Sequence, residues 1–205
     1  MKKYRDEFKQ FIVEGDKLIA EIPNNLLEFT ITADELNKRN FNKLSSLTTP
    51  QSAIAVCKKP LSSAINSNFV PVLDRIQDPT NVGAILRTAA AANLRDVILL
   101  EGTADAFSSK SIRASMGAIF HLNLVEMSEK DLLNKNFNLV AAHINGFDYR
   151  QFKLPSKCAI IFGNEGGGVS KNLLDVATKI NIPIHNVESL NVNAAAAILL
   201  FHYAI

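Results

Sequence analysis

The chain has 205 residues, of which 47% are hydrophobic and 20% are charged, and its formal net charge is +2. This composition is ordinary for a globular protein and excludes a strongly charged, disordered chain. No apolar run reaches the roughly 18 residues that a membrane span needs, so we expect none. The N-terminus is charged and lacks the apolar core of a secretory signal, so the cytoplasm is the expected compartment.

The first part of the chain predicts a small α/β unit. Short helices are expected over residues 4–10, 16–21 and 41–47, with another helix starting at 32–35, and strands over 11–13, 27–32 and 52–57. Residues 59–68 include Pro60 and several Ser and Asn residues without apolar periodicity. They are interpreted as a linker between a domain of residues 1–58 and a second domain of residues 69–205.

From residue 69 onward, strands alternate with helices. Strands are expected over 69–73, 96–100, 122–125, 138–144, 158–162 and 180–184, and helices over 82–92, 109–119, 128–133 and 170–177. The last helix is apolar nearly all round, through Phe201 and Tyr203. This alternation predicts an α/β fold with a mostly parallel sheet and helices on both faces.

Cysteine and histidine usage indicates no metal site. Cys57 and Cys158 lie in apolar runs without CxxC spacing, which is typical of buried free thiols in a reducing compartment. No HExxH or Cys/His ligand spacing occurs, so no metal is expected. From the residues alone, His121 and His143 beside apolar strands are interpreted as structural.

The first polar cluster spans residues 74–89. A turn is expected over 78–81, so that Asn81 lies near the N-cap of the following helix. Arg87 comes six residues later, a little under two turns, and is displaced round the helix from Asn81. A guanidinium on an Ala-rich helix suits a phosphate or a carboxylate, and a surface ion pair is the other interpretation.

The second cluster, residues 160–170, is an apolar strand that runs into a loop with four glycines and Glu165. Glycine permits close approach of the backbone to a ligand, and a flexible turn is the other interpretation. The spacing matches neither GxGxxG nor GxxxxGK, so a dinucleotide or triphosphate loop is disfavoured.

The third cluster precedes the last helix and contains Glu188, Ser189, Asn191 and Asn193. Polar side chains at the edge of a core need a partner in the protein or in a ligand. A Ser189 nucleophile would need a base, and nothing in the sequence orients His185 toward it. Both residues also fit ordinary loop positions.

Together the three clusters resemble the sequence motifs of the SpoU (TrmH) RNA ribose methyltransferases of the SPOUT superfamily. The matching segments are 81–89, 162–168 and 182–192, and residues 113–121 resemble the family's middle segment. Residues 11–17 resemble, more loosely, the small ribosomal-protein-like substrate-binding domain that many members carry. The resemblance implies a C-terminal trefoil knot, which is an exception to the rule against threaded chains.

The same resemblance implies the reaction and its partners. S-adenosylmethionine is the expected methyl donor, an RNA ribose 2′-hydroxyl is the expected acceptor, and a homodimer is the expected assembly. Ribosomal RNA is the first expectation because a substrate domain precedes the catalytic one, and transfer RNA is the second. A non-catalytic RNA-binding or assembly protein with the same fold is the competing class.

The cations expected to meet RNA phosphate are Lys2, Lys3, Arg5, Lys9, Lys38, Arg39 and Lys43, although a solvated surface fits each of them equally.

Site residues also follow from the resemblance. Arg87 is implied as the central catalytic residue, oriented together with the ribose by Asn81, Glu165, Ser189 and Asn191. A guanidinium holds its proton and is a poor base, so we interpret Arg87 as a clamp on phosphate and on the developing alkoxide. Cofactor contacts are expected from Gly163, Ile182, Leu190, Ala142, His143, Ile184 and Val192.

The chain departs from the family pattern at a few positions. Asn186 and Asn93 stand where glycine is common, and Asn193 stands where a small residue is usual. The loop over 182–189 looks one residue short. These differences affect the expected shape of the cofactor loop and leave the principal polar residues in place.

Overall fold

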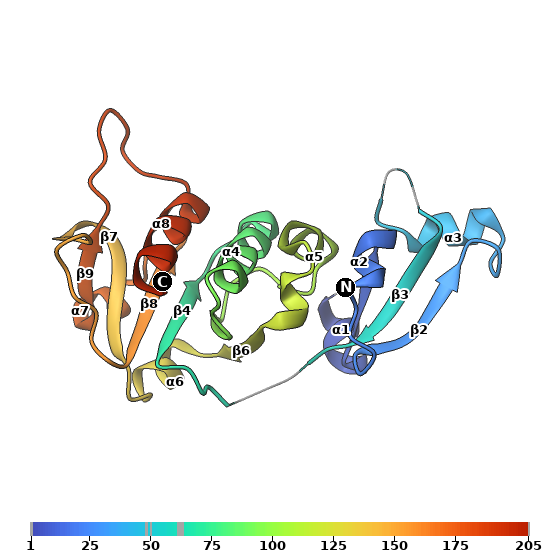
Figure 1. Cartoon of the computed structure of the whole chain (residues 1–205), viewed down its shortest axis with the longest axis horizontal. Coiled ribbons are helices and arrows are strands. Elements are labelled where there is room, and N and C mark those ends of the chain that lie inside the picture. The colour runs from blue at the N-terminus through green and yellow to red at the C-terminus, as the bar shows by residue number, and fades with distance from the viewer. Residues whose placement is uncertain (1, 48, 50, 61–63, 205) are drawn as a thin grey trace.

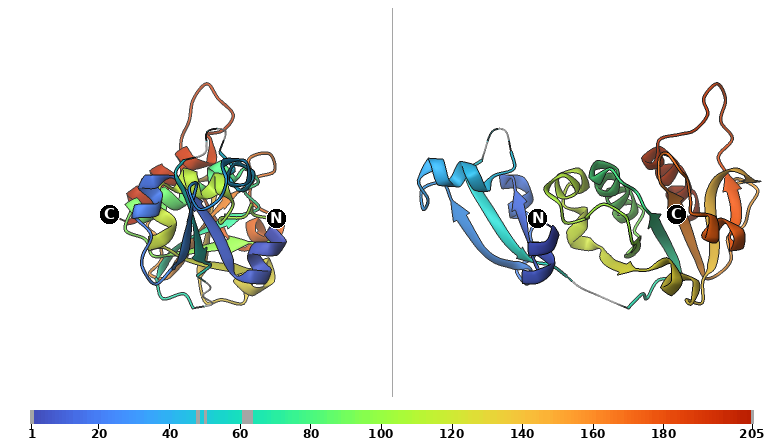
Figure 2. Two further views of the ribbon diagram at one scale, coloured as in Figure 1. Left: turned by 90° about the vertical axis from the view of Figure 1, so that its right-hand side faces the viewer. Right: turned by 180° about the vertical axis from the view of Figure 1, so that it is seen from behind.

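The structure is a computed structural model that describes every residue except 1, 48, 50, 61–63 and 205. Two sheets organise it: a three-stranded antiparallel sheet in the order β1-β3-β2, and a six-stranded sheet in the order β6-β5-β4-β8-β7-β9. Figures 1 and 2 show the small sheet at one end of the molecule, beside α5 and β6, and β7, β9 and α8 at the other end.

The small sheet carries three short helices. The elements are α1 (Lys2–Phe8), β1 (Gln10–Glu14), α2 (Asp16–Ala20), β2 (Leu27–Thr32), α3 (Lys38–Leu44) and β3 (Ala53–Lys58). The helix start expected at 32–35 is wrong, because residues 33–35 form a turn. The Glu35 carboxylate accepts hydrogen bonds from Thr32 N and Oγ1 at 2.8 and 3.0 Å, so contacts like those of a capping box close this turn. The helix begins only after Asn37, whose side chain caps it.

Every strand pair of the larger sheet is parallel. Its strands are β4 (Phe69–Asp74), β5 (Asp96–Leu100), β6 (Asn123–Met127), β7 (Asn138–Asp148), β8 (Cys158–Gly163) and β9 (Thr178–Asn181). The helices are α4 (Pro79–Ala91), α5 (Ser109–Ser115), the 3-10 turn η1 (Ala118–His121), α6 (Glu129–Leu133), α7 (Lys171–Val176) and α8 (Val192–Ala204).

Helices cover both faces of this sheet. On one face, Leu73 of β4 packs in a cluster with Leu86 of α4 and Leu199 of α8. On the other face, Val72 packs with Leu132 of α6 and Leu173 of α7. Successive strand residues point to opposite faces, so one apolar strand serves both cores. The predicted α/β fold class is therefore confirmed, whereas the trefoil knot stays a prediction.

Four predicted boundaries in this part were wrong, and the first is the end of β7, which runs to Asp148 rather than 144. The helix expected from 82 begins at Pro79, because Asp78 is its N-cap and proline fits the first helical turn. The helix expected over 109–119 stops at Ser115, where Met116 and Gly117 both adopt positive φ. The last strand ends at Asn181 rather than 184, since Pro183 has no N–H for the ladder.

The two sheets share one continuous hydrophobic cluster. Phe11 of β1 and Phe107, which precedes α5, have ring centroids 5.0 Å apart. The Lys59 ammonium, on a side chain only 4% exposed, binds Asp6 of α1 at 2.8 Å and Glu126 of β6 at 3.1 Å. The division into residues 1–58 and 69–205 stays a prediction, and part of the linker expected at 59–68, residues 61–63, lies outside the described residues.

Both cysteines are buried and free, and burial raises the pKa of each thiol to about 12. Among the described residues, no helix has the length and apolar character to cross a membrane. The same described part of the chain holds no group of three or more His, Cys, Asp or Glu side chains that could bind a metal ion.

Candidate active site

A cavity of about 600 Å³ opens at the carboxyl end of β8 and beside residues 142–144 in the middle of β7, just past the part of β7 that pairs with β8; ligands bind at the carboxyl ends of strands in open parallel sheets. Its walls are the end of β8 with the following glycine-rich loop, the loop over 182–191, and the first turns of α8. All seven residues expected to contact the cofactor line it: Ala142, His143, Gly163, Ile182, Ile184, Leu190 and Val192. The structure thus brings together residues that lie up to 50 positions apart in the sequence.

Glycine at position 163 is required by backbone crowding. A Cβ there would lie 2.1 Å from Val169 N and 2.2 Å from Gly168 C. The two strands of the loop approach this closely because Asn164 and Gly168 exchange backbone hydrogen bonds of 3.0 and 2.8 Å. Gly168 has a φ of +64°, which closes the turn. The loop is therefore ordered by its own backbone, in contrast to the flexible-turn interpretation.

Glu165 projects from this loop into a chain of side-chain hydrogen bonds. Asn81 Nδ2 donates to Glu165 Oε1 at 2.6 Å, and Asn193 Nδ2 donates to Asn81 Oδ1 at 2.5 Å. A carboxylate only accepts, so Glu165 fixes the orientation of both amides. Asn81 is 9% exposed and is the third residue of α4, in the first turn after the N-cap Asp78, which agrees with its expected place near the N-cap.

Glu165, Ser189 and Asn191 line the cavity, and Asn81 reaches it through Glu165. The Asn191 side chain also accepts a hydrogen bond from Asn193 N at 2.9 Å, which satisfies a free donor in the first turn of α8. Among the described residues, no hydrogen bond joins Ser189 to His185, which lies outside the cavity lining. Within the described part of the chain, no hydrogen bond connects the Ser189 hydroxyl to a base.

Arg87 is the one expected catalytic residue that the structure does not bring to the cavity of its own chain. It lies on α4, is exposed, and contacts none of the described residues through a hydrogen bond or ion pair. The surface ion pair considered as its other role is therefore not formed within the described part of the chain. Its guanidinium is available to a ligand or to a second chain.

The departure at Asn186 has a simple backbone explanation. Asn186 has a φ of +65°, the left-handed region where glycine is favoured and asparagine is tolerated. Asn93 likewise has a φ of +58° and follows α4, which confirms the left-handed cap expected there. At both positions the asparagine keeps the backbone conformation that glycine would supply.

Sequence reasoning missed two groups of residues around the site. Asn193 was placed in the third polar cluster and noted as a departure from the pattern but was given no role, although its amide completes the chain to Glu165. The ion pair of Asp74 and Arg75, together with Asn164, anchors the glycine-rich loop to the end of β4. A carboxylate directly after an apolar strand was the available signal for Asp74.

Comparisons with known proteins agree with this geometry. Residues 68–201 match the model of the SpoU rRNA Methylase family. The 23S rRNA (guanosine(2553)-2′-O)-methyltransferase RlmP of Bacillus subtilis is 34% identical, with 98% of this chain and 91% of that protein covered.

Solved structures of RNA methyltransferases also resemble this chain over nearly its whole length. A TrmH-family protein from Porphyromonas gingivalis superposes with a TM-score of 0.87 at 32% identity and covers 98% of this chain and 91% of that chain. An AdoMet-bound rRNA methyltransferase from Sinorhizobium meliloti has a TM-score of 0.82 at 28% identity, with 98% and 89% covered. The chain belongs to the SpoU rRNA methylase family and is an RNA 2′-O-ribose methyltransferase.

Proposed function

We propose that this protein methylates the 2′-hydroxyl of one ribose in the RNA of the large ribosomal subunit, in the cytoplasm. The support is the relative from Bacillus subtilis, which is named for 23S rRNA and is similar over 98% of this chain. Similarity over that length includes the small antiparallel sheet as well as the larger one. Transfer RNA is the second candidate, because other relatives are named for tRNA or rRNA without distinction.

The cavity suits S-adenosylmethionine as the donor. Its volume of about 600 Å³ lies in the range of small-molecule sites, and its lining combines apolar side chains with exposed backbone. We assign the donor to the seven lining residues named above, largely through their backbone groups. S-adenosylmethionine supplies a methyl group that is already activated on a sulfonium, so the protein has mainly to position the acceptor.

The polar residues divide into an orienting set and a charge-stabilising residue. Glu165, held by Asn81, and the cavity-lining Ser189 and Asn191 are assigned to orienting the ribose. Arg87 is assigned to the RNA phosphate and to the oxygen that becomes negative as its proton leaves. A guanidinium keeps its own proton at neutral pH, so Arg87 acts through charge and hydrogen bonds rather than as the base.

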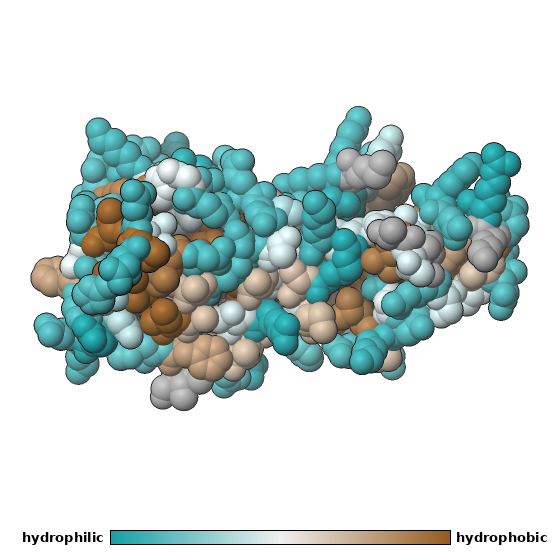
Figure 3. Space-filling model, turned by 90° about the horizontal axis from the view of Figure 1, so that it is seen from above, coloured by the Kyte–Doolittle hydropathy of each residue, from teal (hydrophilic) through white to brown (hydrophobic). Residues whose placement is uncertain are grey.

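A homodimer would complete this site. Arg87 lies outside the cavity of its own chain, so we place it at a cavity to which a second chain contributes. The surface at the end that holds β7, β9 and α8 is rich in apolar side chains (Figure 3). Ile144 and Phe147 of β7 are 63% and 65% exposed, and Phe201 of α8 is 44% exposed. Exposed apolar groups of this size favour association with another protein surface.

RNA selection is assigned to residues 1–58, which we propose form a separate recognition domain joined by a linker over 59–68. The cations exposed there and free to meet phosphate are Lys2, Lys3, Lys9, Arg39 and Lys43, and the side chain of Lys38 lies outside the described part of the structure. Arg5 is a weaker candidate, because its guanidinium binds the Asp105 carboxylate at 2.5 Å. The cationic contact surface of this part of the chain is therefore smaller than the sequence alone suggests.

The competing class is an RNA-binding or assembly protein that has lost catalysis. Such a protein would be expected to lose the polar residues that serve the reaction. Here Asn81 and Glu165 remain hydrogen-bonded at 2.6 Å beside a cavity of donor size, and this observation carries the enzymatic proposal.

The first experiment is transfer of labelled methyl from S-adenosylmethionine to total RNA from cells that lack this protein. The label is then mapped to its nucleotide. We expect a single 2′-O-methylated ribose in large-subunit rRNA. Label in tRNA would replace the substrate proposed here, and failure to bind the donor at all would support the non-catalytic class.

A further inference from the structure

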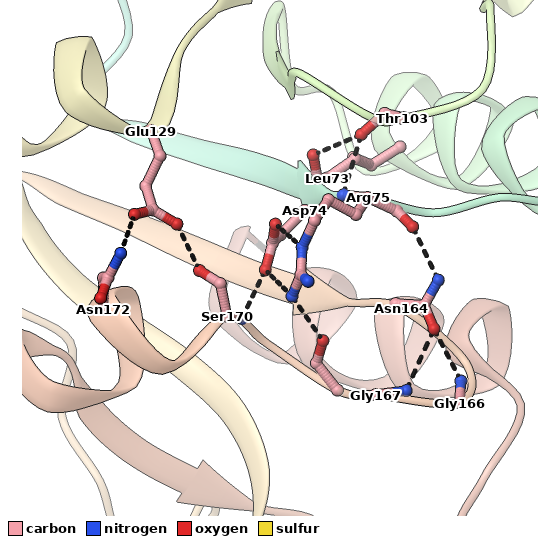
Figure 4. A network of polar contacts seen from close by, with 11 residues as sticks. Leu73, Asp74, Arg75, Thr103, Glu129, Asn164, Gly166, Gly167, Ser170 and Asn172 are labelled. Carbon is pink, nitrogen blue, oxygen red and sulfur yellow. Dashed lines mark hydrogen bonds and ion pairs between the residues drawn. The ribbon is translucent and has the colours of Figure 1, made fainter.

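The glycine-rich loop is anchored at one side by an ion pair at the end of β4 between the buried Asp74 and the half-exposed Arg75 (Figure 4). Arg75 Nε and Nη2 donate to the two oxygens of the Asp74 carboxylate at 2.9 and 3.2 Å. The same carboxylate accepts a hydrogen bond from Ser170 N at 2.6 Å. Arg75 Nη2 also donates to Gly168 O at 3.3 Å. The pair thus reaches the end of the loop that leads into α7.

The other side of the loop is held by the backbone of the same residue. Asn164 Nδ2 donates to Arg75 O at 2.9 Å, and Asn164 Oδ1 accepts from the backbone N–H groups of Gly166 and Gly167 at 2.8 and 3.0 Å. Glu165 lies between these anchored residues. Figure 4 shows Arg75 at the centre, with contacts to both ends of the loop.

Arg75 occupies a backbone conformation that favours glycine. Its φ is +55°, and non-glycine residues persist in such conformations where the surroundings demand them, often at functional sites. Its stem packs on Gly102, where an added Cβ would lie 3.1 Å from Arg75 Cγ. Glycine at position 75 would remove the strain, so the arginine side chain must bring a compensating benefit.

We propose that Arg75 is a positioning residue, which holds the loop over 163–168 so that Glu165 stays within hydrogen-bonding reach of Asn81. The inference rests on the proposed function only through the role of Glu165. The Arg75 side chain is 41% exposed, so its ion pair with Asp74 is partly screened and adds little to global stability. The hydrogen bond from Arg75 to Gly168 O lies within the loop, so we expect substitution of Arg75 to change the mobility of the loop rather than the global stability.

The test compares Arg75→Gly with Arg75→Lys and with the control Asn93→Gly. The control relieves the same left-handed strain at an exposed residue remote from the cavity. Arg75→Lys keeps a cation beside Asp74 but loses the fork that also reaches Gly168 O, so it guards against misfolding of the glycine variant.

The first readout is amide hydrogen exchange of the peptide over 163–170, which needs neither RNA nor activity. We expect exchange to rise by at least about tenfold in Arg75→Gly, less in Arg75→Lys, and not in Asn93→Gly. Unchanged exchange in this peptide would overturn the proposal. So would an equal rise in β4, β8 and α4, because that pattern reports global destabilisation.

The second readout is a double-mutant cycle with Glu165→Gln on the single-turnover rate of methyl transfer. If Arg75 acts through Glu165, Arg75→Gly slows transfer in the parent protein but has little further effect beside Glu165→Gln. Equal slowing in both backgrounds would refute the coupling. If the parent protein transfers no methyl at all, the proposed function fails, while the exchange experiment still decides whether Arg75 holds the loop.

Discussion

Asn193 Nδ2 lies 2.5 Å from Asn81 Oδ1, and this contact joins the first turn of α8 to the first turn of α4. The other amide atom of Asn193, Oδ1, is buried without a hydrogen-bond partner among the described residues. A buried acceptor without a partner costs free energy, so the Asn193 side-chain oxygen lowers the stability of the fold. Its benefit is the fixed orientation of Asn81, which in turn donates to Glu165.

Asn193→Ala should therefore separate activity from stability. We expect kcat for methyl transfer to fall about 2- to 10-fold, the size of one neutral hydrogen bond. The melting temperature should change little, since alanine removes the unpaired Asn193 acceptor and favours the helix but leaves Asn81 Oδ1 without its donor. Steady-state kinetics and a thermal melt test this. Asn138→Ala, which loses a similar amide contact to Lys157 O far from the cavity, is the control and should leave kcat unchanged.

Arg87→Ala should abolish the reaction without disturbing the fold. The Arg87 side chain makes no hydrogen bond or ion pair with a described residue and does not line the cavity, so the melting temperature and the donor dissociation constant should not change. The methyl-transfer rate should fall at least about 100-fold, as for loss of a preorganised charge at a developing anion. Lys130→Ala, an exposed cation on the opposite face of the sheet, is the control. Full activity of Arg87→Ala would refute the mechanism.

Gly163→Ala should weaken donor binding through the backbone. The added Cβ would lie 2.1 Å from Val169 N, so the end of β8 and the loop must separate. Overpacking of this kind costs about 1–3 kcal/mol, which corresponds to roughly 5- to 150-fold in the donor dissociation constant. Calorimetric titration with S-adenosylmethionine measures this dissociation constant. Gly167→Ala is the matched comparison, since its Cβ meets nothing closer than Asn164 Oδ1 at 3.9 Å, and equal losses in both variants would contradict this explanation.

Asp96 should make stability depend on acid pH. Burial alone would raise its pKa, but hydrogen bonds from Ser67, Asn123 and Asn66 outweigh burial and hold the pKa below its ordinary value of 3.8. A carboxyl with a lowered folded pKa stabilises the fold above its unfolded pKa, and this contribution disappears as the pH falls through the folded pKa.

Asp96→Asn should accordingly lower the free energy of unfolding at pH 7 by about 1–3 kcal/mol, the range for hydrogen bonds to a charged group. The difference from the parent protein should shrink as the pH falls below 3.8. Urea unfolding at a series of pH values checks this, with Asp34→Asn at an exposed turn as the control. A difference that stays constant with pH would show that the Asp96 charge is not responsible.

Local patterns predicted much of this structure, and the errors have identifiable causes. Asn93 was recognised as a left-handed cap because its signal lies within one helix end. Asp78–Pro79 fits both a turn and a helix start, so the beginning of α4 was placed too late. Met116 gives no local sign of its positive φ, and the break after α5 was missed.

Long-range contacts account for the rest. The seven cavity residues were identified by resemblance to known motifs, which carries information on tertiary structure that periodicity lacks. Arg75 and Gly168 are 93 positions apart, and no spacing rule joins the end of β4 to a loop that follows β8. The same holds for Asn81 and Asn193, 112 positions apart.

The buried Lys59 ammonium, bound to both Asp6 and Glu126, has a consequence for substrate choice. Together with the Arg5–Asp105 pair and the Phe11–Phe107 contact, it fixes the small sheet at a set distance from the cavity. If the small sheet binds one feature of the RNA, only a ribose whose distance from that feature equals the distance between the sheet and the cavity can enter the site. The enzyme would then select its nucleotide by the distance and direction from the bound RNA feature to the target ribose, rather than by contacts with the base.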